Sequence, residues 1–454
     1  MNTLIAISGL GVLCLLFEIL NFRKAIIPVT ILGLLAILGI TYTEFNTPAS
    51  YYNNMITVSK FSSVFSALFI ILTVFLIALA HEYYRDHQTK LSDFIAIKIF
   101  MLAGAVAMVS FGNLAMFFLG IEVLSISLYI LAASQRLNVK SNEAGMKYFL
   151  LGSFASGIIL FGICFIYGAM GSFDVAEITE WSRSAELPIW FPIGIALVSI
   201  GMFFKIAAVP FHFWAPDVYE GSPTMTTATM STLAKVVAIA TLYKLLTAMN
   251  ADLSDVSINI IIIISIASMT VGNIMALKQT NVKRMLAFSG VSHAGFMLMT
   301  LLNISNSAGN LLYYTTAYSL SGIAAFTVIL YTCKKNKRIE AFNGLGKRNP
   351  LMAAILTASL LSMAGIPIFA GFFAKMFLFT QTIAAGYLVV VIAAVINSII
   401  SVGYYFKLIL AMYNKEPNEE AIKTPFVYYA VAIVSILLNI VLGLFPSAVL
   451  NLLG

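Results

Sequence analysis

Residues 200–238 read IGMFFKIAAVPFHFWAPDVYEGSPTMTTATMSTLAKVVA. Two lysines of this stretch, Lys205 and Lys235, lie inside long apolar segments, and a proline, a histidine and a short polar connection separate them. A lysine in the middle of a bilayer costs several kcal/mol, so it is rarely kept there without a partner and a function. The stretch therefore predicts a membrane protein that moves charge.

The composition supports this interpretation. The chain has 454 residues, of which 60% are hydrophobic and only 10% are charged. Soluble globular proteins have charged residues at about a quarter of their positions. Apolar runs of about 20 residues match the hydrocarbon thickness that an α-helix must span. We therefore predict an all-α polytopic membrane protein, with no β-strands.

We predict about fourteen transmembrane helices from these apolar runs. A tight turn at Gly112 and Asn113 separates the fourth from the fifth, and the twelfth is unusually long. The predicted ranges are approximately 2–20, 25–43, 61–80, 94–112, 113–133, 146–170, 189–213, 224–249, 257–277, 285–302, 309–333, 350–382, 386–412 and 425–447.

The distribution of basic residues predicts the orientation. With an outward N-terminus, the outward loops hold only Lys60 and Arg183, and the other basic loop residues face inward. Cytoplasmic loops are enriched in lysine and arginine, so both termini are expected to face outward. The inward residues are Arg23, Lys24, Arg85, Lys90, Arg136, Lys140, Lys147, Lys278, Lys283, Arg284, Lys334, Lys335, Lys337, Arg338, Lys347, Arg348, Lys415 and Lys423.

Other site classes find little support in the sequence. The net charge of +7 is explained by these loops, so no nucleic-acid partner is expected. The three cysteines, Cys14, Cys164 and Cys333, are far apart and form no C-x-x-C pair, which argues against a metal site, an iron–sulfur cluster or a disulfide framework. No glycine fingerprint for a dinucleotide follows a strand. We therefore expect no metal and no cofactor in this chain.

Several charged residues lie near the ends of predicted spans. Lys98, Lys244, Lys407 and Glu18 are expected to extend toward the membrane surface, because a long side chain can reach the interface from such positions.

Four charged residues lie too deep for that: Glu122, Lys205, Lys235 and Lys375. One alternative is that they form buried ion pairs that only fix helix packing. However, three lysines face a single carboxylate. Burial favours the neutral amine, and a nearby carboxylate favours the ammonium ion. A movement of Glu122 relative to Lys205 would therefore bind or release a proton, which is the behaviour of a pump element.

Prolines interrupt two of the spans that carry these lysines. Pro210 lies in the seventh span and Pro367 in the twelfth, and GMFFK at 201–205 resembles GFFAK at 371–375. An ordinary packing kink is one explanation of each proline. Broken helices beside charged residues are also typical of transporters built from repeats. We predict one domain over 1–454, with two inverted five-helix repeats (spans 4–8, about 94–249, and spans 9–13, about 257–412), broken helices 7 and 12, and peripheral helices in 1–93 and 413–454.

Two histidines are candidate proton relays near neutral pH, namely His212 and His293. Each could equally be a histidine that only hydrogen-bonds a neighbour. The hydroxyl-rich run 224–232 before Lys235 is suited either to holding water molecules or to close helix packing.

Three motifs resemble those of the subunit N family of respiratory complex I, the NADH–quinone oxidoreductase. They are FKIAAVPFHFWAPDVYEGSPT at 204–224, KRMLAFSGVSHAGF at 283–296 and GIPIFAGFFAK at 365–375. The resemblance covers essentially the whole chain. Members of this family are antiporter-like and related to subunits of multisubunit sodium/proton antiporters. A lysine at 375 and the lack of a long lateral C-terminal helix distinguish this chain from the subunit M and subunit L types.

The resemblance implies that Glu122, Lys205, Lys235 and Lys375 carry protons. Protons would enter from the cytoplasm towards Lys235, pass the His293 region to Lys375, and leave outward, driven by quinone reduction elsewhere. Flavin, iron–sulfur clusters and quinone are then expected in partner subunits of the membrane and peripheral arms. A subunit of a cation/proton antiporter that works without redox chemistry is the alternative function, and a scaffold with purely structural charges is a second.

Overall fold

The computed structural model describes residues 1–84, 91–184, 187–249, 254–332, 337–414, 416 and 424–453. Cys333, Lys334 and Lys335 lie outside the described residues, as do Arg85, Lys90, Lys415 and Lys423 from the predicted inward loops.

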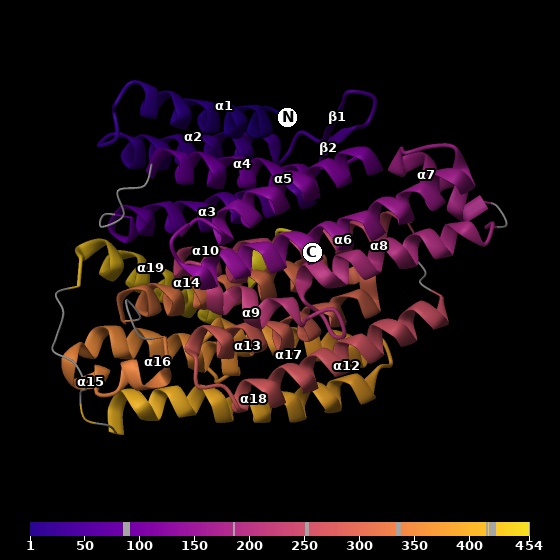
Figure 1. The fold of residues 1–454 in the computed structure, drawn as a ribbon. Coiled ribbons are helices and arrows are strands. Elements are labelled where there is room, and N and C mark those ends of the chain that lie inside the picture. Colours follow the sequence, from indigo (N-terminus) through magenta and orange to yellow (C-terminus); the bar gives the residue numbers. More distant parts are fainter. Residues whose placement is uncertain are drawn as a thin grey trace. The chain divides into compact units, whose positions relative to one another are not determined.

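The fold is almost entirely helical, as predicted (Figure 1). Within the described residues, 12 helices are long and apolar enough to cross a membrane, and two shorter apolar helices cover Trp190–Ile206 and Pro350–Ala364. These shorter helices belong to the seventh and twelfth predicted spans. Every predicted span therefore has a helical counterpart, and the multi-pass fold class is confirmed.

The chain divides into two compact units. Unit 1 comprises Met1–Ile77, His87–Ile206 and Leu233–Asp255, and unit 2 comprises Ala78–Asp86, Ala207–Thr232 and Val256–Gly454. The repeat boundaries stay a prediction, because the compactness of a unit carries no information about repeat symmetry.

Unit 1 is built on two closely packed helix pairs, α4 with α5 and α6 with α8, and α6 and α8 lie side by side in Figure 1. Its elements are α1 (Asn2–Ile19), α2 (Ile26–Glu44), β1 (Ala49–Tyr51), β2 (Ile56–Val58), most of α3 (Lys60–Tyr83), α4 (Leu91–Val109), α5 (Leu114–Ala132), α6 (Val139–Met170), α7 (Val175–Ser184), α8 (Trp190–Ile206) and α11 (Lys235–Met249).

Unit 2 contains the remaining elements. They are α9 (Trp214–Gly221), α10 (Thr224–Thr229), the start of the π-helix η1 (Met230–Ala234), α12 (Asp255–Leu277), α13 (Val282–Leu298), the 3₁₀ helix η2 (Met299–Asn306), α14 (Ala308–Thr332), the 3₁₀ helix η3 (Ile339–Phe342), α15 (Leu345–Arg348), α16 (Pro350–Ala364), α17 (Ala370–Ala384), α18 (Leu388–Asn414), α19 (Phe426–Leu444) and α20 (Ser447–Leu450).

A short antiparallel hairpin of β1 and β2 corrects the prediction that the chain has no strands. Ala49 pairs with Val58 and Tyr51 with Ile56. The turn places Asn53 and Asn54 at φ +50° and +62°, in the left-handed region that asparagine tolerates better than most residues. Three-residue strands are too short to give a clear alternating pattern in a mostly apolar sequence.

Asparagine side chains begin several of the helices. Asn113, the residue of the predicted tight turn, accepts a hydrogen bond from the backbone N–H of Met116 at the start of α5. Asn281 caps α13, and Asn349 caps α16 ahead of Pro350. Such caps satisfy N–H groups that have no partner within the helix.

Helix α13 is surrounded by protein over nearly its whole length. It crosses α12 closely, because a Cβ atom on Gly272 would lie 2.6 Å from the backbone nitrogen of Ser292. A membrane helix enclosed on all sides can carry polar side chains without exposing them to lipid. This position explains how Ser289, Ser292 and His293 are accommodated in an apolar span.

Both predicted breaks are present. Helix α8 ends at Ile206, ahead of Pro210, and Ala207 follows it with φ +60°. Helix α16 ends at Ala364 and α17 begins at Ala370, so Pro367 lies in the gap between them. A proline cannot donate the backbone hydrogen bond that continues a helix.

The second break brings α17 against α16 through Gly371. A Cβ atom at this position would lie 1.9 Å from the carbonyl oxygen of Ser362, so only glycine fits. This contact fixes the start of the helix that carries Lys375.

We expect Gly371→Ala to push α17 away from α16 and to destabilise the protein by about 1–3 kcal/mol, as overpacking of a tight site does. The measurement is the thermal unfolding midpoint of the purified, detergent-solubilised protein. Gly157→Ala is the control, because nothing lies within 4 Å of a Cβ atom there and helical alanine is preferred to glycine. Equal midpoints for the two variants would contradict the contact.

Candidate functional site

Lys205 lies in the last turn of α8 and is surrounded by hydroxyl groups of unit 1. Its ammonium group donates to Ser125 Oγ at 2.8 Å, to Ser156 Oγ at 3.3 Å and to Tyr129 OH at 3.4 Å. Helix α5 supplies Ser125 and Tyr129, and α6 supplies Ser156. Neutral hydroxyls solvate the ammonium group without fixing it in one ion pair.

Glu122, the acidic partner that the sequence predicted for Lys205, lies in α5 of the same unit. The two groups make no ion pair within 4.0 Å among the described residues, and Glu122 Oε1 is buried without a hydrogen bond there. A buried carboxylate oxygen without a partner is costly. This oxygen of Glu122 is therefore not held by any hydrogen bond to the described residues.

Lys235 begins α11, directly after the π-helix η1. Only 3% of this residue is exposed, so its side chain is enclosed by protein as the sequence predicted. Short π-helical turns inside α-helices occur frequently at functional sites. The hydroxyl-rich run before it is also buried, and Thr229 and Thr232 donate to carbonyl oxygens one turn back in the same helix.

Lys375 lies in α17 beside the break in its span. Its ammonium group donates to the carbonyl oxygen of Ala364 at 2.8 Å, the last residue of α16, and lies 4.8 Å from the ring centroid of Phe296. The break leaves carbonyl groups at the end of α16 without helical partners, and in a membrane these need another donor. Lys375 is one such donor, and the residue is only 5% exposed.

His293 lies in α13, in the same unit as Lys375. Its Nδ1 atom is 2.8 Å from the hydroxyl of Tyr314, and its Nε2 atom is 3.3 Å from the hydroxyl of Tyr405. A cavity of about 10 Å³ is lined by His293, Tyr314, Tyr318 and Lys375, among others. That volume is about what one water molecule needs. The structure thus brings two of the predicted site residues to one small cavity.

His212 has a different environment. It is half-buried in the segment between α8 and α9, and its Nδ1 atom makes no hydrogen bond to the described residues. No hydrogen bond among the described residues links it to another predicted site residue.

Of the lysines expected to extend toward the membrane surface, Lys98 is enclosed by protein and Lys244 is partly exposed. Lys98 is only 1% exposed within α4. Lys244 donates to the carbonyl oxygens of Val109 at 2.8 Å and Phe111 at 2.7 Å, at the C-terminal end of α4. A cation there interacts favourably with the helix dipole. By contrast, Lys407 is exposed and Glu18 binds the exposed Arg23, as expected for residues near span ends.

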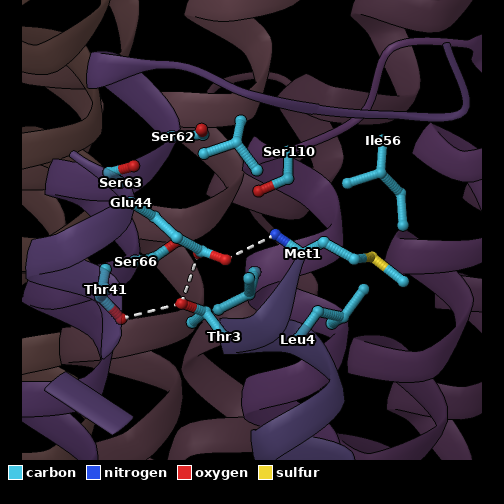
Figure 2. A pocket seen from close by; sticks show the side chains of 12 residues that line it. Met1, Thr3, Leu4, Thr41, Glu44, Ile56, Ser62, Ser63, Ser66 and Ser110 are labelled. Carbon is cyan, nitrogen blue, oxygen red and sulfur yellow. Dashed lines mark hydrogen bonds and ion pairs between the residues drawn. The ribbon is translucent and has the colours of Figure 1, made fainter. Parts of the chain in front are cut away.

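A polar pocket around Glu44, the last residue of α2, was missed by the sequence analysis. Figure 2 shows Met1 and Thr3 bonded to its carboxylate and Thr41 bonded to Thr3, and serines of α3 also line the pocket. The terminal ammonium group lies 2.8 Å from Glu44 Oε1, and Thr3 donates to Oε2 at 2.7 Å. This ion pair fastens α1 to α2. A glutamate ending an apolar span was the signal in the sequence.

The motifs at 204–224 and 283–296, both quoted in the sequence analysis, contact each other through residues of unit 2. Arg284 of α13 lies 2.5 Å from Asp217 and 3.4 Å from Glu220, both in α9. Lys283, fully buried, donates to the carbonyl oxygens of Glu220 and Ser222 at the end of α9. These basic residues were counted as loop charges from the sequence. In the structure they hold the short helix that follows the break after α8.

The chain is similar to known proteins along its whole length. Residues 112–401 match the family described as NADH:quinone oxidoreductase/Mrp antiporter, TM. An NADH-quinone oxidoreductase subunit N from Flavobacterium johnsoniae is 76% identical, and the match covers 100% of both chains. A subunit N from Cytophaga hutchinsonii is 44% identical over 100% of this chain and 99% of its own.

Two solved structures share the fold of this chain over nearly its whole length. A chain of respiratory complex I from Thermus thermophilus with bound aureothin has a TM-score of 0.86 and 29% identity, over 99% of this chain and 98% of that chain. A chain of the Mrp complex from Dietzia sp. DQ12-45-1b has a TM-score of 0.88 over 99% and 95% of the two chains, but at 20% identity it shows a shared fold alone. As its signature motifs predicted, the chain belongs to the NADH:quinone oxidoreductase/Mrp antiporter family and matches subunit N members along its whole length.

Proposed function

We propose that the chain is a proton-translocating membrane-arm subunit of an NADH–quinone oxidoreductase and that it carries out no redox chemistry itself. Quinone reduction in partner subunits would drive the proton movement. Family membership and the whole-length match to subunit N relatives support the assignment. The observation that carries the mechanism is the water-sized cavity that His293 shares with Lys375.

In unit 1, the proton-binding step would be controlled by Glu122. Lys205 is solvated by three hydroxyls, which can follow either protonation state by rotating. The charge of Glu122 favours the ammonium form of Lys205. Moving the carboxylate away removes that preference, and the lysine releases its proton.

In unit 2, the proton-binding group would be Lys375. As an ammonium ion it donates to the carbonyl oxygen of Ala364 and faces the ring of Phe296. A cation–π contact of this kind also favours the charged form. One water molecule in the shared cavity would connect it with His293.

The partners and the location form part of the same proposal. Flavin, iron–sulfur clusters and quinone would be bound by other subunits, and the chain would contact those subunits and the lipid bilayer. It would lie in a bacterial inner membrane with both termini outward, because the basic loop residues then face the cytoplasm. Protons would move from the cytoplasmic side outward, with Lys235 near the entry.

We expect Lys235→Ala to lower the number of protons pumped per NADH oxidised while the complex still assembles. The buried amine is the proposed carrier, and a positioned proton-transfer group accelerates transfer by about 10²–10⁴-fold. The measurement is proton uptake by inverted membrane vesicles, normalised to NADH oxidation.

Lys407→Ala is the matched control, because this lysine is exposed and bonds to the carbonyl oxygen of Gln279. If the assembled Lys235→Ala complex pumps as many protons per NADH as the Lys407→Ala control, Lys235 is not a proton carrier. Sodium-coupled exchange by the isolated chain in liposomes would instead support the antiporter alternative.

We expect Glu122→Gln to lower the same stoichiometry, because the amide keeps the size of the side chain but removes the charge that, in this proposal, favours the ammonium form of Lys205. Glu143→Gln is the control: Glu143 is exposed and pairs with Lys147 on the surface of α6, where such pairs contribute little. If the two variants pump equally, Glu122 has no part in the proton-binding step.

A further inference from the structure

The hydroxyl of Tyr405 occupies a position that the mechanism above does not use. His293 has a tyrosine partner at each ring nitrogen, and the two partners come from different helices: Tyr314 from α14 and Tyr405 from α18. A neutral imidazole donates from one nitrogen and accepts at the other. One tyrosine must therefore accept from the ring while the other donates to it.

Tyr405 also bonds to a second group on α13. Its hydroxyl lies 2.5 Å from Ser289 Oγ, one helical turn before His293, and either oxygen can be the donor. Tyr405 is 0% exposed and Ser289 is 1% exposed, so no bulk water competes for these contacts. The result is a continuous hydrogen-bonded chain of Ser289, Tyr405, His293 and Tyr314.

The chain ends at the small cavity. Tyr314 and His293 both line it together with Lys375, and its volume of about 10 Å³ admits about one water molecule. That water would close the gap between the tyrosine and the lysine. All these residues belong to unit 2.

We propose that Tyr405 is a proton-relay residue that joins Ser289 to His293; the proposal rests on the proton-translocating function proposed above. As Tyr405 takes a proton from Ser289, its own hydroxyl proton moves to His293 Nε2. The ring releases its Nδ1 proton to Tyr314, whose hydroxyl proton passes through the water to the neutral amine of Lys375. Ser289 regains a proton from those that enter on the cytoplasmic side in the proposed function, so each relay group gains one proton for each that it gives.

Another buried tyrosine provides a matched control. Tyr313 precedes Tyr314 in α14 and is also 0% exposed, but its hydroxyl donates to the carbonyl oxygen of Leu442 at 2.8 Å. A carbonyl oxygen cannot pass a proton onward. Tyr313→Phe therefore removes one buried hydrogen bond of similar kind and leaves the relay intact.

The test uses the assembled complex in inverted membrane vesicles. Six variants are compared, namely Tyr405→Phe, Ser289→Ala, His293→Gln, the double variant of Tyr405→Phe with His293→Gln, Tyr313→Phe and Lys375→Gln. The readouts are protons pumped per NADH and the solvent deuterium isotope effect on pumping. Tyr405→Phe should slow the relay step by about 100-fold or more. It should lower the proton stoichiometry as far as His293→Gln does. Combining Tyr405→Phe with His293→Gln should lower the stoichiometry no further, because the effects of residues that act in series are not additive. Tyr313→Phe should match the unmodified complex in stoichiometry and isotope effect.

Three outcomes would overturn the relay. They are an unchanged stoichiometry in Tyr405→Phe and Ser289→Ala, an equal loss in Tyr405→Phe and Tyr313→Phe, or a further loss when Tyr405→Phe is added to His293→Gln. Lys375→Gln separates this result from failure of the function itself. If that variant loses pumping while Tyr405→Phe does not, only the relay is wrong, and if neither loses pumping, the proposed function fails as well.

Discussion

The contact between the ammonium group of Lys375 and the carbonyl oxygen of Ala364 is the constraint on which the arrangement of unit 2 depends. A carbonyl group left unpaired at the end of a helix inside a membrane must find a donor, and an ammonium group there must find an acceptor. The hydrogen bond between the carbonyl and the ammonium group removes the free-energy cost of leaving either one unpaired. The break in the helix and the buried charge are therefore one feature, and Gly371 is required so that the two helix halves come close enough to form it.

In unit 1, the buried ammonium group of Lys205 finds its hydrogen-bond acceptors in a different way. The chain leaves the helical conformation directly after Lys205, but the ammonium group bonds to side-chain hydroxyls and not to a freed carbonyl. The segment beyond that break belongs to unit 2, where Arg284 and Lys283 hold α9. A freed carbonyl offers one fixed acceptor, whereas hydroxyls can reverse their role from acceptor to donor. Lys205 therefore has an environment that accommodates both the ammonium ion and the neutral amine.

Much of the fold was predictable because hydrophobic length alone defines a membrane helix. The fourteen spans, the breaks near Pro210 and Pro367 and the Asn113 turn all follow from local sequence. The burial of Lys98 and the contacts of Lys244 did not, because hydropathy does not tell a lipid-facing helix from an enclosed one. Its position near a span end suggested that Lys98 reaches water, but neighbouring helices cover it.

The candidate site shows the same division. Charged residues deep in apolar runs identified Glu122, Lys205, Lys235 and Lys375, since few residues are so costly in a membrane. Tyrosines such as Tyr314 and Tyr405 gave no such signal, because a tyrosine fits an apolar helix whether or not its hydroxyl is used. Pairing of Arg284 with Asp217 joins motifs 67 positions apart in sequence, and only the folded chain reveals it.

The small size of the space between His293 and Lys375 has a consequence for ion selectivity. A volume of about 10 Å³ accepts a single water molecule, through which a proton can pass by exchange of bonds without any atom crossing the gap. A sodium ion would have to travel bodily, and it needs several coordinating oxygens around it wherever it stops. On the proton path proposed above, a space of this size would favour a proton over a sodium ion.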